Sequence, residues 1–304
     1  MNFNFLLDFT ISAGILSLFN WGVAPEVKPH ESFVINKSGT VIDCRGGTFN
    51  SGKITEIVVV SGPVNQLKNV VIRNCKLNGS IRVFGMGRNG EAPVLKASSV
   101  KAGHTQRAQA AAPTNVLISN MHIQAAGRIP VYIAPGVTNT TLENSRLTGY
   151  STSVALYLDA ESARNVIRNN TFLVTSVASY REVVAVDGSA ENVILGNHFP
   201  DVRYGGIYLY RNCGEAGVIR HQPPVRNIIE RNSFGLKRLA WNDYGIWLGS
   251  RQGNRSYCSD DRGYTFGSSD DDRDNANENV LVGNTFENST RTIRNDGRNN
   301  IIRN

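Results

Sequence analysis

The chain lacks the short motifs that mark several large enzyme classes. It has no glycine-rich phosphate loop, no G-x-S-x-G nucleophile motif and no histidine pair at metal-ligand spacing. Nothing in it therefore points to a nucleotide-dependent enzyme, an α/β-hydrolase or a zinc peptidase. The acidic stretch Asp270–Asp274 lacks the glycine and the glutamate of an EF-hand loop. We expect a solvated acidic loop there, with a calcium site as the alternative, and predict no other cofactor or metal.

Long apolar runs are also scarce. The most apolar stretch without a charged residue is Phe9–Pro25, which is marginal for a membrane span, so we predict no membrane partner. Residues 1–40 are either a secretory leader or a cap on the open end of a repeat protein. The apolar run favours a leader, but no lysine or arginine precedes it and Asp8 interrupts it, so the sequence leaves both readings open.

Acidic residues and cysteines are both few. The 25 Asp and Glu are outnumbered by 32 Lys and Arg, which gives a net charge of +7 and favours anionic partners. The basic residues are scattered along the chain, so we predict no nucleic acid. An even count of 4 cysteines favours an oxidising compartment, hence a secreted or periplasmic protein. We expect a disulfide between Cys213 and Cys258, while the state of Cys44 and Cys75 stays open.

What the sequence has in abundance is a repeat, typified by Asn165–Phe172. An asparagine is followed by β-branched or aliphatic residues, a second asparagine at i+5 and a large apolar residue at i+7 or i+8. Successive copies lie about 25 residues apart in the middle of the chain, and asparagine suits tight corners because it tolerates the left-handed conformation. We predict an all-β, single-stranded parallel β-helix over residues 41–304. The other copies begin at Asn69, Asn115, Asn139, Asn192, Asn227, Asn279 and Asn299.

Three longer intervals between copies indicate insertions, at residues 85–114, 211–226 and 250–278. Each follows the same predicted strand of its coil, so all three should project from one edge of the solenoid. The coils over residues 128–188 carry no insertion. We therefore expect a groove with these low coils as its floor and the insertions as walls at its two ends, since insertions gathered on one face of a repeat protein are often its binding face.

The strands before this edge place unusual side chains outward. Their alignment by apolar alternation puts Tyr132, Tyr157, Ala185, Tyr208 and Trp247 in one column. An aromatic column is costly in water unless something covers it. Either the loops pack over Tyr208 and Trp247, or the rings bind sugars as a platform.

The next outward column contains Asp159, Asp187 and Tyr210. Two carboxylates on adjacent coils raise one pKa, as a general acid requires, although each aspartate could instead bond the corner that follows it. On the expected wall, arginine can bind a carboxylate and histidine can transfer a proton, or the arginines pair with acidic residues of the loops. The wall residues are Arg211, Glu215, Arg220, His221 and Arg251.

With its asparagine-studded coils, the chain from about Val41 to Asn304 resembles the right-handed parallel β-helix repeat proteins of the pectate-lyase-like superfamily. That group includes polysaccharide lyases, uronate epimerases and carbohydrate-binding relatives. The resemblance implies a groove on a parallel sheet that binds a polymer, often acidic. The Asn-Thr-Asp and Gly-His-Gly motifs of polygalacturonases and the Asp-Pro-His-Asp motif of mannuronan epimerases are missing, so no catalytic residue is carried over.

We expect a carbohydrate-active enzyme that cleaves an acidic polysaccharide or oligosaccharide by β-elimination. Arg211, Arg220 or Arg251 would neutralise the uronate, and Tyr210 or His221 would remove its C5 proton. One alternative is a glycoside hydrolase that uses the two aspartates. Another is a non-catalytic glycan-binding or tailspike-like protein that forms homo-oligomers through its apolar last coil, Ile301–Ile302.

Overall fold

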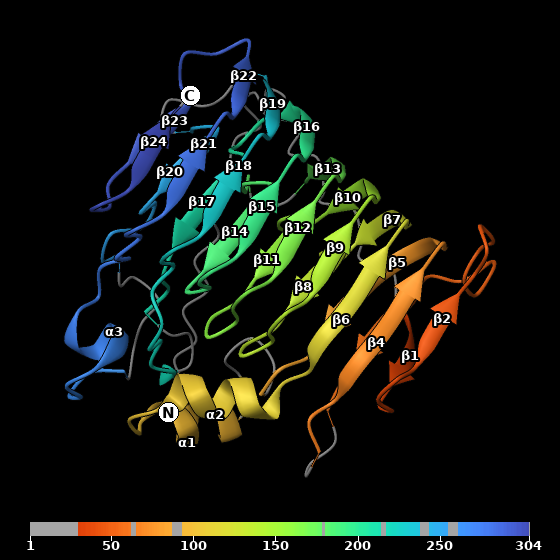
Figure 1. The fold of residues 1–304 in the computed structure, drawn as a ribbon, viewed down its shortest axis with the longest axis horizontal. Coiled ribbons are helices and arrows are strands. Elements are labelled where there is room, and N and C mark those ends of the chain that lie inside the picture. Colours follow the sequence, from red (N-terminus) through yellow and green to blue (C-terminus); the bar gives the residue numbers. More distant parts are fainter. Residues whose placement is uncertain are drawn as a thin grey trace, which may run out of the picture.

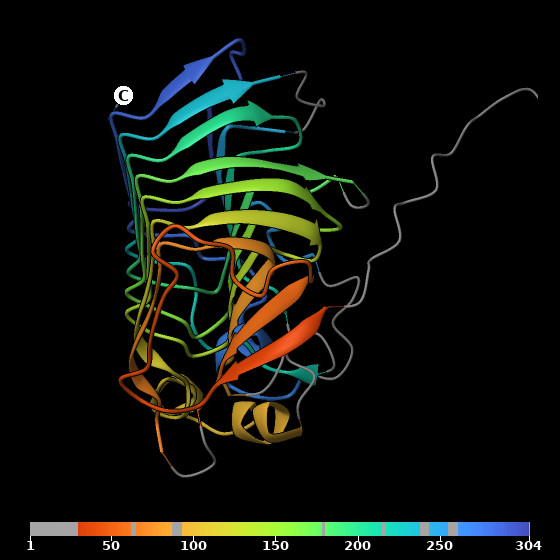
Figure 2. The same cartoon turned by 90° about the vertical axis from the view of Figure 1, so that its right-hand side faces the viewer.

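The computed structural model describes residues 30–61, 65–86, 93–177, 180–213, 217–237, 243–254 and 261–303. Its strands wind into a parallel β-helix, and the coils stack along the long axis of the molecule (Figures 1 and 2). Most coils add one strand to each of three sheets, in the chain order B, C, A. The predicted all-β parallel β-helix is thus confirmed. Residues 1–29 lie outside the described part of the chain, so the leader or cap stays a prediction.

The three sheets have the following strands. Sheet A contains β1 (Glu31–Ile35), β3 (Thr55–Val59), the second half of β5 (Lys76–Val83), β8 (Val131–Ile133), β11 (Leu156–Leu158), β14 (Val184–Asp187), β17 (Ile207–Tyr210), β20 (Ile246–Leu248) and β23 (Ile293–Asn295). Sheet B contains β2 (Val41–Asp43), β4 (Lys68–Arg73), β6 (Thr114–Ser119), β9 (Thr141–Glu143), β12 (Val166–Arg168), β15 (Val193–Leu195), β18 (Ile228–Glu230), β21 (Val280–Val282) and β24 (Ile301–Arg303). Sheet C contains the first half of β5, β7 (His122–Gly127), β10 (Arg146–Ser151), β13 (Thr171–Ser176), β16 (His198–Val202), β19 (Ser233–Leu236) and β22 (Thr285–Glu287).

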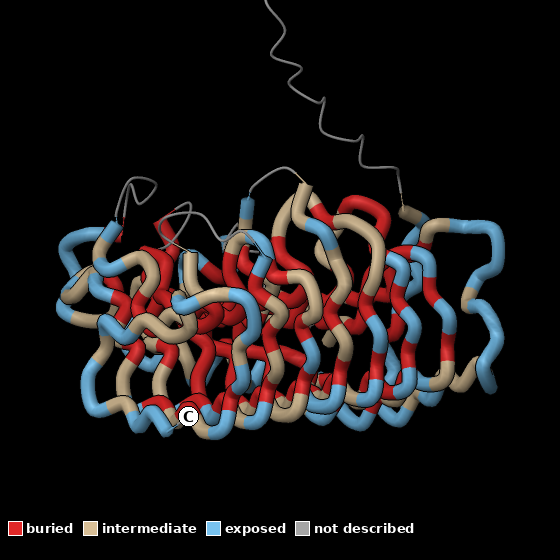
Figure 3. The backbone as a smooth tube through the Cα atoms, turned by 90° about the horizontal axis from the view of Figure 1, so that it is seen from above, coloured by how far each residue is buried: buried red, intermediate tan, exposed pale blue. Residues whose placement is uncertain are grey.

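The interior of the coil is lined by side chains stacked in columns. Alternate residues of each strand point inward, so the buried residues form a continuous lining in Figure 3 while exposed residues lie outside. One such column is a stack of near-parallel rings, Phe172, Phe199, Phe234 and Phe286, whose centroids are 4.7–5.0 Å apart. Equivalent residues of successive repeats are therefore in direct contact, because each coil stacks on the next.

The repeated asparagines are of two kinds, which the sequence pattern merged. In the later coils they point inward and are buried. Asn192 Nδ2 donates to Asn227 Oδ1 at 2.8 Å, and Asn227 Nδ2 to Asn279 Oδ1 at 3.0 Å. A second ladder runs in the same way through Asn170, Asn197, Asn232 and Asn284. Each amide oxygen also accepts a backbone N–H of the preceding coil, so the ladders satisfy groups that burial would otherwise leave unpaired.

The early asparagines instead occupy the corners. Asn69, Asn115 and Asn139 have φ between 54° and 59°, and the residues that follow them, not the asparagines, face inward. Arg164 takes the equivalent left-handed corner one coil after Asn139, and Asn165 is the inward residue. Our alignment of the two groups was wrong by one residue, because a shift of one position exchanges the inner and outer faces of a strand.

The three insertions share one edge, as expected, but they do not stand apart as walls. The first forms α1 (Pro93–Ser99) and α2 (His104–Ala111), which lie along the edge in Figure 1, and the third contains α3 (Gly267–Asp270). Backbone N–H of Ile219 donates to Ser99 Oγ at 3.1 Å, so the second insertion contacts the first. Glu161, buried at a left-handed corner of the low coils, accepts the N–H of His221 at 2.7 Å and the hydroxyl of Thr105. The first two insertions therefore cover the end of the coil that carries Glu161 and do not stand apart from each other.

The loop at Asp270–Asp274 is not simply solvated. Asp274 is buried, and its carboxylate accepts the backbone N–H groups of Arg211 at 3.0 Å, Arg251 at 2.7 Å and Gln252 at 2.9 Å. It therefore ties the third insertion to the ends of two sheet A strands. None of the described helices is long and apolar enough to cross a membrane.

The ladder of buried asparagines predicts that substitution of an inward asparagine lowers the free energy of unfolding much more than substitution of a corner asparagine. Asn227→Ala should lower the free energy of unfolding by about 2–4 kcal/mol, because it leaves the amide and backbone N–H of Asn192 unpaired and opens a cavity. Asn120→Gly, at an exposed left-handed corner, should change it by less than about 0.5 kcal/mol. Urea denaturation of both variants measures this, and equal losses would contradict the two-kind assignment.

Candidate functional site

The outward columns of sheet A have the predicted register. Tyr157 pairs with Tyr132 on one side and Ala185 on the other, and Tyr208 pairs with Ala185 and Trp247. The column continues to Arg82 at one end and Arg294 at the other. In the next column Asp187 pairs with Tyr210. The alignment made from apolar alternation therefore identifies true neighbours, while the roles proposed for these residues remain predictions.

Tyrosines of one coil bond to aspartates of the next. The Tyr132 hydroxyl donates to Asp159 Oδ2, and the Tyr157 hydroxyl donates to Asp187 Oδ2 at 2.7 Å. Arg220 Nη1 lies 3.4 Å from Asp159 Oδ1. The two aspartates are 2% and 0% exposed, and Arg220 is equally buried. Two carboxylates and one guanidinium thus share a desolvated site beneath the insertions.

Asn212 completes this site, and no motif or spacing in the sequence pointed to it. Its backbone N–H donates to Asp187 Oδ1 at 2.8 Å, and its Nδ2 donates to Asp187 Oδ2 at 2.5 Å. Its Oδ1 accepts from Arg251 Nη1. Asn212 is the second residue after β17, where the chain leaves the sheet, so its position depends on how the second insertion folds. We could not infer it from a single strand pattern.

Burial dominates the electrostatics of the site. Desolvation, together with the charge of Asp187, raises the pKa of Asp159 to about 6, although the charge of Arg220 opposes this. Burial and the neighbouring aspartates also raise the pKa values of Tyr132 and Tyr157 well above their usual range, so both phenols stay protonated as donors. Asp159 is therefore a carboxyl that can hold a proton near neutral pH, as a general acid does.

A second buried cluster adjoins the first and includes two residues that the sequence analysis missed. Arg181 Nη2 lies 2.7 Å from both Glu182 Oε1 and the Tyr210 hydroxyl. The Arg251 guanidinium lies over the Tyr210 ring, 4.0 Å from its centroid. Burial, followed by the charge of Glu182, raises the pKa of Tyr210 far above its usual value. Tyr210 is thus unsuited to the proton abstraction that we assigned to it.

Two predicted site residues lie elsewhere. The Arg211 side chain donates to the backbone carbonyls of Asp271 and Arg273, the latter at 2.8 Å, and so braces the third insertion. His221 Nε2 lies 2.7 Å from the Ser99 carbonyl, and its ring packs against Phe266. Their expected convergence on the aspartates is therefore wrong, because both side chains are used to hold the insertions together. Of the four predicted wall cations, Arg220 and Arg251 reach the site.

The expected open groove is also wrong at this position. Tyr132 and Tyr208 are only 1% and 7% exposed, and Tyr244 N–H donates to the Tyr208 hydroxyl at 3.0 Å, so the loops cover these rings. Tyr157 and Trp247 are half-buried. The outer face of sheet A therefore offers isolated aromatic edges beside arginines and not a continuous platform of rings.

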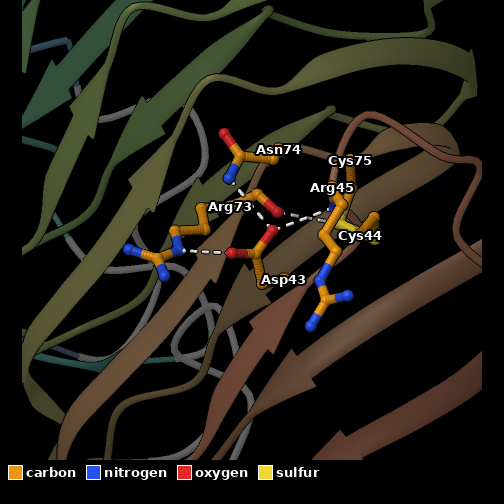
Figure 4. The surroundings of a disulfide bond; sticks show 6 residues. All are labelled: Asp43, Cys44, Arg45, Arg73, Asn74 and Cys75. Atoms are coloured by element: carbon orange, nitrogen blue, oxygen red, sulfur yellow. Dashed lines mark hydrogen bonds and ion pairs between the residues drawn. A yellow bond between two sulfur atoms is a disulfide. The ribbon is translucent and has the colours of Figure 1, made fainter.

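The cysteines divide between the described and the undescribed parts of the chain. Cys44 and Cys75 form a disulfide between the first and second coils (Figure 4), a pairing that the sequence left open. Glu215 and Cys258 lie outside the described residues, so the role of Glu215 and the bridge from Cys213 to Cys258 stay predictions. In the part of the chain that the structure describes, no three His, Cys, Asp or Glu residues converge as metal ligands.

The raised pKa of Asp159 predicts a pH-dependent stability. A carboxyl whose folded-state pKa lies above its unfolded value stabilises the fold below pH 3.8, and this contribution is lost as the pH rises through about 6. The loss should be on the order of 3 kcal/mol between pH 4 and 7. Subtracting the unfolding profile of Asp159→Asn from that of the wild type reports this carboxyl together with its electrostatic coupling to Asp187. A flat difference over this range would contradict the assignment.

Comparison with known proteins supports the architecture. Residues 64–260, more than half of the chain, match the family described as right handed beta helix region. No curated protein sequence matches the chain. Among solved structures, an alginate lyase from Paenibacillus sp. str. FPU-7 is 11% identical with a TM-score of 0.32, over 90% of this chain and 93% of the other.

Two phage proteins are similarly distant. The tailspike protein of E. coli bacteriophage HK620, solved with a pentasaccharide, is 12% identical with a TM-score of 0.33 over 88% of this chain. Tailspike protein 2 of bacteriophage CBA120 is 10% identical with a TM-score of 0.23. This chain spans 52% and 42% of their lengths, respectively. At these similarities none of the three assigns a reaction to the site. The stacked parallel sheets and the family match together show that this chain belongs to the right-handed β-helix family.

Proposed function

We propose that the protein is a carbohydrate-active β-helix protein that binds an acidic polysaccharide along the outer face of sheet A. The observation that carries the proposal is the placement of arginines over aromatic rings along this face. Arg294 lies 4.4 Å from the centroid of the half-buried Trp247 and also pairs with Asp296 at 2.7 Å. Arg82 lies 5.0 Å from the centroid of the covered Tyr132 ring and pairs with Glu56 at 2.6 Å. Guanidinium groups bind carboxylates through paired hydrogen bonds, and aromatic faces suit the C–H faces of sugar rings.

A crevice beside this face supports the same class of ligand. Tyr180 is 71% exposed and its ring meets that of Tyr204 at 4.9 Å. Tyr204 lines a crevice of about 40 Å³ together with Asp201, Arg203 and the buried Glu182. An exposed aromatic pair next to fixed polar groups is the usual composition of a sugar subsite. The acidic-glycan proposal therefore extends from sheet A to the corner that leads into it.

For a reaction, the geometry favours hydrolysis by Asp159 and Asp187 over the β-elimination that we first expected. Asp159 has a pKa of about 6, so it can hold a proton as a general acid does, and Asp187 lies beside it on the next coil. The two bases assigned to elimination are unsuited, because His221 contacts the first insertion and Tyr210 is buried and protonated. A sugar chain would approach the carboxylates past Tyr157, the half-buried member of the cluster.

The binding proposal predicts a loss of affinity in Trp247→Ala. This change removes a ring and the support of Arg294, so affinity for polyuronate oligosaccharides should fall roughly tenfold. Tyr264→Ala, which removes an exposed ring in the third insertion, is the matched control and should bind as the wild type does. Calorimetric titration with polyuronate and neutral dextran measures both. Equal affinity of the wild type for both polymers would contradict an acidic ligand.

The hydrolysis proposal is tested by the product. Incubation with a panel of uronic-acid polymers should release reducing ends without the ultraviolet absorbance of an unsaturated sugar. Asp159→Asn and Asp187→Asn should each lower the rate at least about 100-fold while oligosaccharide binding persists. Absorbance at the product band would instead establish elimination. Intact binding without turnover on any polymer would favour the non-catalytic glycan-binding alternative.

The proposal places the protein outside the cytoplasm. The disulfide between Cys44 and Cys75 favours an oxidising compartment, and an extracellular or periplasmic protein would meet polysaccharides there. Homo-oligomers through the last coil stay a prediction, to be checked by sedimentation.

A further inference from the structure

A second charged surface lies on sheet C, away from the arginines of sheet A. Lys76, His122 and Arg146 begin three consecutive strands, β5, β7 and β10, and pair in register. All three side chains point outward and are exposed. Because neighbouring strands lie about 4.8 Å apart, the three groups form a basic column roughly 10 Å long.

The adjacent outward column on sheet B shows that this arrangement is unusual for the chain. There, cations alternate with carboxylates of neighbouring coils. Arg73 Nε lies 2.9 Å from Asp43 Oδ2, and Arg168 Nε lies 2.8 Å from Glu143 Oε2. On sheet B, exposed cations of these coils are thus paired with carboxylates. The basic column lies on sheet C, across the corner between the two sheets, and contains no acidic residue.

Among the described residues, no carboxylate contacts the basic column. In the described part of the chain, the one side-chain hydrogen bond of its members is between His122 Nε2 and the Thr148 hydroxyl, at 3.4 Å. The nearest acid of the corner, Asp43, is already occupied by Arg73, Asn74 and the backbone of Arg45. Lys76 and Arg146 lie on the two strands that flank β7, so both can reach an anionic group placed over His122.

The column borders a real concavity. A cleft of about 470 Å³ is lined by Lys76, His122 and Arg146, by Arg45 and by corner asparagines, with no acidic residue in its lining. The disulfide of Cys44 and Cys75 immediately precedes Arg45 and Lys76 in the chain, and Figure 4 shows the Arg45 guanidinium directed away from Asp43. The bridge thus fixes the backbone at two of the four cationic positions.

Neutral hydrogen-bonding groups flank the cations. The next outward column on the same three strands contains Asn78, Gln124 and Thr148, paired in register. Thr148 donates to Gln124 Oε1 at 2.8 Å, which orients this amide. Amides and hydroxyls match the hydroxyl groups of a sugar chain. The cleft lining contains no Phe, Tyr or Trp ring on which a base could stack, which disfavours single-stranded nucleic acid.

We propose that this face of sheet C is a binding site for an anionic polysaccharide, formed by Arg45, Lys76, His122 and Arg146 with Asn78 and Gln124. The sugar chain lies across β5, β7 and β10, its carboxylate or sulfate groups meet the basic column, and its hydroxyls meet the amide column. This site is separate from sheet A and goes beyond the function proposed for that face. It would hold the polymer at a second place on the same protein.

The test uses a double variant that removes two cations of the column. Lys76→Gln/Arg146→Gln should weaken binding of polyuronate or sulfated dextran at this site at least about tenfold at low ionic strength. The matched control is Arg164→Gln/Arg226→Gln, which removes the same charge from two exposed arginines that pair with Glu191. The control should keep the wild-type affinity. An equal loss in both variants would mean a net-charge effect and overturn the site.

Chemical footprinting separates this site from sheet A. Diethylpyrocarbonate labels exposed histidine and lysine, so oligosaccharide should protect His122 and Lys76 and leave the exposed Lys37 labelled. In the Trp247→Ala variant this protection should persist, even where sheet A no longer binds. Polyuronate and sulfated dextran as separate ligands identify the anionic group. Absence of protection with both, or equal protection by single-stranded DNA, would overturn the assignment.

Discussion

The structure depends on the hydrogen bonding of buried asparagine amides between coils. Each inward amide bonds the next amide and a backbone N–H of the neighbouring coil, so adjacent coils can pack in one register only. In the early coils, where Val70, Val116 and Thr140 take the inward place, hydrophobic packing and left-handed corners perform the same task. Fixed register then decides which outward side chains become neighbours, and every surface described above follows from it.

On sheet A, that register produces a buried polar layer outside the core. Tyrosine hydroxyls reach the aspartates of the following coil, and Arg220 supplies one compensating charge. A buried carboxylate pair is costly, and the hydrogen bonds from Tyr157 and Asn212 offset part of that cost. The same contacts that stabilise this layer also set the pKa of Asp159, so stability and proposed chemistry are coupled in one cluster.

The two proposed binding faces treat their cations differently. On sheet A the arginines lie on aromatic rings and pair with the carboxylates of Glu56, Glu182 and Asp296, which limits their motion. On sheet C no carboxylate of the described residues contacts the basic column. Binding on sheet A therefore depends mainly on pre-positioned groups, and binding on sheet C depends mainly on charge neutralisation. The affinity of the sheet C face should fall more steeply with salt than that of the sheet A face.

The sequence by itself determined the coil, the edge that carries the insertions and the outward columns of sheet A. It could do so because parallel stacking converts a spacing of about 25 residues into direct contact. It did not separate inward from corner asparagines, since the pattern that surrounds Asn139 and Asn165 is the same while their faces differ.

Only the tertiary structure decided which residues form the site. Arg220 and His221 are adjacent in the sequence, yet one side chain reaches Asp159 and the other contacts the Ser99 carbonyl. Likewise, the Arg211 side chain donates to two backbone carbonyls of the third insertion, while Asn212 donates to Asp187. The contacts of Arg211 and His221 join insertions that lie 60 and 122 residues apart in the chain and share no repeat. No local spacing encodes such contacts, and the packing of the loops over the coil ends selects among them.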